Sequence, residues 1–98
     1  MELNKNQYVM YKGLPLVREG DTICYGDLNE KYMLMLNILT KKANGEPDMI
    51  MVQICYTSDK NKIVNGKQAF KNDLFEALDL GSIWLDQLIK DENKKMES

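Results

Sequence analysis

The residues that could do chemistry in this chain are cysteines and carboxylates, because its 98 residues include no histidine. Histidine is the commonest general base and a frequent ligand of zinc and non-haem iron, so its absence excludes the usual catalytic triad and most such metal sites. Cys24 and Cys55 stand in apolar, strand-like segments and lack the C-x-x-C spacing of zinc or redox sites. We expect both to be small core residues in a reducing compartment rather than a disulfide.

Two short motifs begin like functional loops but lack the residues on which those functions depend. The stretch 59–64 starts like a calcium-binding loop, yet it has valine where that loop requires glycine, and two lysines intrude. The stretch 81–85 starts like the nucleophile elbow of hydrolases, but it has no closing glycine and no histidine partner. Neither the P-loop motif G-x-x-x-x-G-K-[ST] nor the dinucleotide-binding motif G-x-G-x-x-G occurs in the sequence. We therefore expect no metal, no cofactor and no catalytic residue.

Carboxylates remain as candidates for acid–base chemistry. Asp21, Asp27 and Glu30 flank an expected strand and could meet in space, while Asp79 and Asp86 lie on the expected helical segment. Paired carboxylates transfer protons in catalysis when burial separates their pKa values. Carboxylates in turns and on helix surfaces are normally solvated, so we expect surface residues here and a protein that is not an enzyme.

Composition limits the class of protein further. A chain that is 44% hydrophobic and 29% charged is typical of one globular domain that needs no disulfide or metal. The formal charge is −2 and only one of the 13 basic residues is arginine, Arg18, which argues against nucleic acids as partners. No apolar run reaches the roughly 18 residues of a membrane span, and MELNKNQYVM lacks the apolar core of a signal peptide. We expect one cytoplasmic domain over 1–98, ordered over about 6–91, with a frayed tail over 92–98.

Alternation and turn residues predict five strands. QYVMY, LPLVR and DTICY are separated by glycine-containing turns and predict a three-strand meander. Pro15 cannot donate a ladder hydrogen bond, so its strand should lie at an edge or begin there. The longer runs 32–42 and 48–57 flank an Asn-Gly and a proline and predict a hairpin with its loop at 43–47.

The hairpin has two different apolar faces. With Lys42 opposite Asp48, Leu36 lies opposite Ile54, and a slip of one residue would exchange the faces. One face is wholly apolar and consists of Leu34, Leu36, Ile38, Val52, Ile54 and Tyr56. The other face is here called the methionine face and consists of Met33, Met35, Leu39, Met51 and Cys55.

The remaining third of the chain is predicted to be a loop followed by helix. The stretch 58–66 is polar and predicts a loop, within which 62–64 could be extended. A glycine inside a helix lowers its stability by about 1 kcal/mol relative to alanine. Two explanations for Gly81 are therefore open: one continuous helix approaches the sheet most closely at Gly81, or two helices join there. Phe75 and Ile83 fall off the apolar stripe, which favours a break near Gly81. That stripe consists of Phe70, Leu74, Ala77, Leu78, Gly81, Trp84, Leu85, Leu88 and Ile89.

These elements predict an α+β fold: an antiparallel sheet of about five strands with the C-terminal helical segment on one face. The helical segment should cover the aliphatic face of the hairpin, which leaves the methionine face without a helix. Either the N-terminal meander curls over the methionine face, or a partner covers it. Because methionine adapts to varied surfaces, our leading hypothesis is an interaction protein that binds a second copy or another protein there.

A different partner is suggested by the tyrosines of the meander. Tyr8, Tyr11 and Tyr25, with Lys12 beside them, could stack the bases of a single-stranded nucleic acid next to a cationic group. Tyrosine is also a common strand residue whose ring simply packs on the sheet. A single-stranded nucleic-acid-binding module is therefore the alternative hypothesis.

Three segments resemble a family of small proteins from anaerobic Gram-positive bacteria. They are YKGLPLVREGDTICYGD (11–27), KYMLMLNIL (31–39) and EALDLGSIWLDQLI (76–89), and the resemblance extends over nearly the whole length. The family has no assigned activity, cofactor or catalytic residue. The resemblance therefore implies a cytoplasmic bacterial protein and carries over no functional residue.

Overall fold

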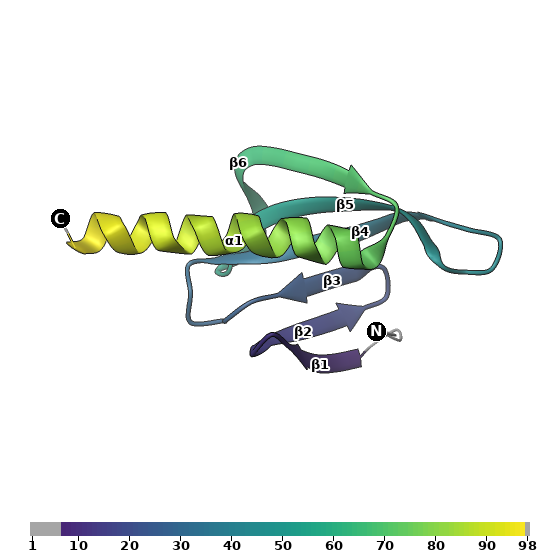
Figure 1. Ribbon diagram of the computed structural model, residues 1–98, viewed down its shortest axis with the longest axis horizontal. Coiled ribbons are helices and arrows are strands. Elements are labelled where there is room, and N and C mark those ends of the chain that lie inside the picture. Colours follow the sequence, from purple (N-terminus) through teal and green to yellow (C-terminus); the bar gives the residue numbers. More distant parts are fainter. Residues whose placement is uncertain (1–6, 98) are drawn as a thin grey trace.

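One antiparallel sheet and one helix make up the computed structural model, which describes residues 7–97 (Figure 1). The strands lie across the sheet in the order in which they occur in the chain, and each is hydrogen-bonded to the next. The predicted α+β fold with a helix on an antiparallel sheet is confirmed, with six strands rather than five. The elements are β1 (Gln7–Tyr11), β2 (Leu14–Glu19), β3 (Thr22–Tyr25), β4 (Tyr32–Lys41), β5 (Pro47–Tyr56), β6 (Asp59–Lys71) and α1 (Leu74–Glu97).

The predicted three-strand meander is present as β1, β2 and β3. Lys12 and Gly13 join β1 to β2, and both have positive φ (48° and 82°), as in the two-residue turns that match the twist of paired strands. Gly20, with φ of 61°, turns β2 into β3. Pro15 lies near the start of β2, which pairs with a strand on each side. Of its two predicted places, the start of a strand is therefore the one observed.

β4 and β5 form the predicted hairpin, but their register differs from the prediction by two residues. Leu36 lies opposite Val52 rather than Ile54. The Lys42 N–H donates to the Glu46 carbonyl at 2.8 Å and closes a tighter turn than the predicted loop. Because side chains alternate with a period of two, a shift of two residues leaves each one on its predicted face.

The strand β6 corrects the prediction of a loop over 58–66 and a helix that already includes Phe70. Phe70 is half-exposed on the sheet, and Asn65 and Gly66 have positive φ (59° and 62°) where the pairing of β6 with β5 is interrupted. Polar and charged side chains are common in edge strands because the backbone along one edge of such a strand is unpaired and exposed to water. That composition explains why the sequence pattern does not reveal β6.

The helix α1 starts at a capping residue and is longer than predicted. The Asp73 carboxylate accepts a hydrogen bond from the Glu76 N–H at 3.2 Å, which satisfies a free donor of the first turn. The helix then continues to Glu97, so residues 92–97, predicted to fray, are helical. Its C-terminal end projects beyond the sheet (Figure 1).

The predicted helix break near Gly81 is wrong, because α1 runs through this position without interruption. A Cβ atom at residue 81 would lie 2.6 Å from Leu34 Cδ2 and closer still to Cδ1. The glycine therefore marks the closest approach of α1 to the sheet, which was the alternative to a break. Phe75 and Ile83, which fall off the apolar stripe, are 46% and 60% exposed on the outer side of the helix.

The main core lies between α1 and one face of the sheet, as predicted. The aliphatic face of the β4–β5 hairpin is buried against Leu78 and Leu85 of α1, with Trp84 and Leu88 partly buried at its margin. No helix of the described residues is long and apolar enough to cross a membrane. The buried residues of the hairpin in this core are Tyr32, Leu34, Leu36, Ile38, Ile50, Val52 and Ile54.

Candidate interaction face

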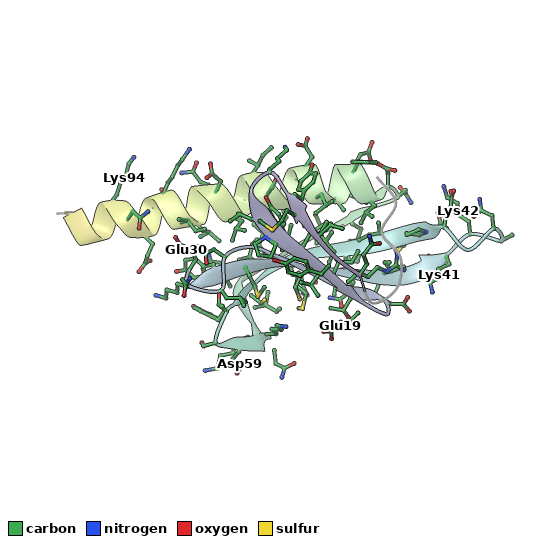
Figure 2. The ribbon with its side chains drawn as sticks, turned by 90° about the horizontal axis from the view of Figure 1, so that it is seen from below. Glu19, Glu30, Lys41, Lys42, Asp59 and Lys94 are labelled. Atoms are coloured by element: carbon green, nitrogen blue, oxygen red, sulfur yellow. The ribbon has the colours of Figure 1, made fainter. Side chains whose placement is uncertain are left out.

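The face of the sheet opposite α1 carries no helix, and we call it the open face. In Figure 2, α1 lies on one side of the sheet, and the β5–β6 turn, marked by Asp59, lies on the other. The strand registers place apolar side chains of all six strands on this face, together with the polar side chains of Glu19, Thr22, Asn37, Gln53 and Gln68. Its apolar side chains include Tyr8, Met10, Pro15, Val17, Cys24, Met33, Met35, Met51, Cys55 and Phe70.

The five residues of the methionine face differ widely in exposure. Met33 and Cys55 are 3% and 0% exposed, Met35 and Met51 are half-buried, and Leu39 is 48% exposed where the pairing of β4 with β5 becomes irregular. The buried pair packs with Cys24, and Met35 and Ile63 lie against this cluster. Part of the methionine face is thus covered by the chain itself.

Met33 and Cys55 are buried by neighbours on both flanking strands, β3 and β6. Cys24 of β3 belongs to the buried cluster, and Ile63 of β6, which pairs with Cys55, packs against it. Both β3 and β6 pair edge to edge with the hairpin and extend the same sheet. The prediction that the meander curls over the methionine face is therefore wrong. The meander instead adds its own apolar side chains to the open face and makes it wider.

A depression lies on the open face between β2, β3 and the start of β6. Its volume is about 400 Å³, within the range of small-ligand pockets. Leu28, which is 71% exposed, stands at its edge, and Glu19 and Lys60 bring opposite charges to its lining. The remaining lining residues are Pro15, Val17, Thr22, Cys24, Gly26 and Met33.

Both cysteines are buried free thiols, as predicted. Burial raises the pKa of Cys55 to about 11 and also raises that of Cys24, against the opposing effect of nearby Lys60. The two residues lie on β3 and β5, with β4 between them. Adjacent strands are about 4.8 Å apart, so the Cα atoms of the two cysteines are separated by roughly 10 Å or more. This separation exceeds the roughly 7 Å limit for a disulfide.

We expect Cys55 to react slowly with thiol reagents in the folded protein. A pKa raised from 9.0 to about 11 lowers the thiolate fraction near neutral pH about 100-fold, and burial restricts access further. Iodoacetamide labelling followed by mass spectrometry should therefore be slow in buffer and fast in urea. The unfolded chain ionises Cys55 at lower pH than the folded one, so the free energy of unfolding should fall as pH rises between 9 and about 11. Equal labelling rates in buffer and urea would contradict the burial.

Three of the five candidate carboxylates interact with separate partners. Asp21 binds Lys41 at 2.9 Å, and Asp86 binds Lys90 at 3.0 Å along the helix. Asp27 accepts a hydrogen bond from the Asn29 N–H at 2.9 Å within its own loop. Glu30 is half-buried and Asp79 is exposed. Within residues 7–97, no group of three or more acidic or cysteine side chains is placed to hold a metal ion.

The structure distributes the four residues of the predicted nucleic-acid face over both sides of the sheet. Tyr8 is 62% exposed on the open face. Tyr11 lies on the helix side, where its ring meets that of Tyr25 edge to face, with 5.6 Å between the ring centroids. The Lys12 amine lies 5.4 Å from the centroid of the Tyr11 ring. Tyr25 is 4% exposed and donates its hydroxyl to the Tyr11 carbonyl at 2.9 Å. Binding of single-stranded nucleic acid stays a prediction.

Several residues of the open face are absent from the sequence-based candidates. Met10 and Val17 follow the alternation of the meander strands, so extending the parity of the hairpin to these strands would have found them. Phe70 was assigned to the helix and could not be found without β6. No family model, curated protein or solved structure matches the chain.

Proposed function

We propose that this protein is a non-enzymatic interaction protein whose open face binds a second copy of the chain. The observation that carries the proposal is a six-stranded sheet with a helix on one face only. Large side chains at both margins of the open face are strongly exposed: Tyr8 by 62%, Met10 by 59% and Phe70 by 50%. Large exposed apolar side chains gathered on one face are typical of a surface that binds a partner.

The polar groups on the open face support a protein partner. Thr22 donates to the Asn37 side-chain oxygen at 3.2 Å, and the Gln53 amide donates to Gln68 at 3.4 Å. Because these groups already satisfy one another in part, a partner could cover them at a smaller cost than isolated polar groups would carry. Sheets commonly pack face to face about 10 Å apart.

The composition of the face favours a second copy as the partner. Glu19 and Lys60 place one charge of each sign beside the depression, so a two-fold axis can bring opposite charges together. Half-buried methionines at the centre, Met35 and Met51, can adjust their shape to an identical surface.

Met35→Lys should halve the native mass of the assembly and leave the fold intact. Met35 is only partly buried in one copy, so a lysine there can reach water, whereas in the stacked pair its charge would be buried without a partner. Native mass spectrometry gives the number of chains, and circular dichroism tests the fold. Ile83→Lys, on the exposed side of α1, is the matched control and should keep the native mass. An unchanged mass for a folded Met35→Lys variant would contradict the proposal.

Single-stranded nucleic acid is a second candidate partner, favoured by the exposure of Tyr8 on the open face. Such binding should weaken steeply as salt is added, because phosphate contacts release counterions. Titration with a short fluorescent single strand at low salt tests it, and no binding there would remove this candidate.

A further inference from the structure

The two edges of the sheet differ in how well they are protected against pairing with another strand. β6 carries four lysines, and Asn65 and Gly66 interrupt its regular course. Lysines and bulges are the usual means of keeping an edge strand from pairing. β1 has the sequence QYVMY, with no charged residue, no proline and no register shift. Within residues 7–97 no strand lies on its outer side.

The turn after β1 determines which backbone groups face outward. In a hairpin with a two-residue turn, the residues that flank the turn exchange both backbone hydrogen bonds, and here these are Tyr11 and Leu14. Such pairs recur at every second residue, so Val9 also bonds inward to β2. The N–H and C=O groups of Tyr8 and Met10 therefore point away from the sheet.

We propose that β1 pairs antiparallel with β1 of a second copy, about a two-fold axis that passes beside Val9. In this register Tyr8 lies opposite the partner's Met10, and Met10 lies opposite the partner's Tyr8. Each of these pairs exchanges two backbone hydrogen bonds, so all outward groups of Tyr8 and Met10 are satisfied. Val9 faces its own copy across the axis.

The side chains of β1 match each other in this arrangement. Tyr8 and Met10 lie on the open face, where the Tyr8 hydroxyl is 3.5 Å from the Met10 sulfur within one chain. Pairing places each ring beside a second methionine, and sulfur–aromatic contacts are favourable. No charge meets a like charge, because β1 carries none. The edge is thus complementary to itself in hydrogen bonding and in side-chain type.

This contact uses the edge and not the open face, so it goes beyond the proposed function. Regular antiparallel pairing about a two-fold axis keeps both open faces on the same side of one continuous twelve-stranded sheet. Face-to-face stacking of two such dimers uses a perpendicular two-fold axis. The two contacts together close into a tetramer, a common symmetric assembly.

Native mass spectrometry of four variants separates the two contacts. We expect four chains for the natural sequence, two for Met35→Lys, two for Met10→Pro and one for the double variant. Proline at residue 10 removes an outward N–H from the edge, whereas Met10→Ala keeps that N–H and should stay tetrameric. If Met10→Pro leaves the mass unchanged while Met35→Lys halves it, the edge contact is overturned and the face contact stands. The reverse pattern overturns the face contact alone.

Amide hydrogen exchange of the Met35→Lys protein tests the edge without a proline. In the edge-paired dimer, the Tyr8 and Met10 amides should exchange as slowly as those of Val9 and Tyr11, and dilution to the monomer should accelerate only the first two. Fast exchange of Tyr8 and Met10 at every concentration, with Val9 and Tyr11 protected, would overturn the proposal even if Met10→Pro fails to fold.

Discussion

Leu36→Lys is expected to unfold the protein, although Met35→Lys at the adjacent position is expected to leave it folded. Leu36 is 0% exposed beneath α1, so the variant loses a buried leucine, worth about 1.5–3 kcal/mol, and leaves an ammonium in an apolar core. An unpaired buried charge costs several kcal/mol more. The sum approaches the roughly 5–15 kcal/mol that stabilises a typical domain.

Urea denaturation followed by circular dichroism measures this difference. Leu36→Lys should show no cooperative transition or lose at least about 4 kcal/mol, the range of severe core changes. Met35→Lys should retain a cooperative transition, lowered only by the loss of the face contact between copies. Similar losses for the two variants would contradict the assignment of these neighbours to opposite faces.

Gly81→Ala should destabilise the protein, although alanine is the better helix former. The intrinsic helix preference favours alanine by about 1 kcal/mol. Against this, a methyl group at residue 81 would overlap the side chain of Leu34, which is 0% exposed and enclosed by the core. Overpacking of a core costs about 1–3 kcal/mol, so we expect a net loss of up to about 2 kcal/mol and a shifted α1.

A double-mutant cycle identifies the cause of this loss. Leu34→Ala alone should cost about 2–5 kcal/mol, but in the Gly81→Ala background it should cost clearly less because the added methyl occupies the vacated space. Additive effects would show that residues 34 and 81 do not contact each other. Ser82→Ala, on the neighbouring and more exposed position of α1, serves as the control, since it raises helix preference without a clash and removes only an exposed hydrogen bond to the Asp79 carbonyl.

Alternation in the sequence was sufficient to assign the two faces of the hairpin, but not its register. Leu36 and Met35 lie on their predicted faces even though their cross-strand partners each differ by two residues from the prediction. The turn decides the partner, and the Lys42–Glu46 hydrogen bond that closes it leaves no trace in the apolar pattern. Likewise, the glycine at position 81 is compatible with either a helix break or a close contact with the sheet. The choice between them depends on the position of Leu34 across the interface, which the sequence does not give.

Sequence alternation predicted the side of the sheet on which the methionine-face residues lie, but it did not predict how exposed each of them is. Met33 and Cys55 lie on the expected side of the sheet, yet they are buried in a cluster with Cys24 of β3, against which Ile63 of β6 packs. β6 was not predicted because its side chains are those of an exposed edge. Tyr8 and Phe70, from the two outermost strands, are strongly exposed on the open face, and within the methionine face Leu39 reaches a similar exposure.

The sequential order of the strands has a consequence for synthesis on the ribosome. Each strand can pair with the one that left the exit tunnel just before it, so the sheet can grow without waiting for distant segments, as in folds with mainly local contacts. The helix α1 is translated after all six strands, and until it emerges the aliphatic side of the nascent sheet stays exposed to water. During that interval the chain is vulnerable to aggregation. A chaperone that shields apolar strands would therefore be needed most until α1 (Leu74–Glu97) has left the exit tunnel.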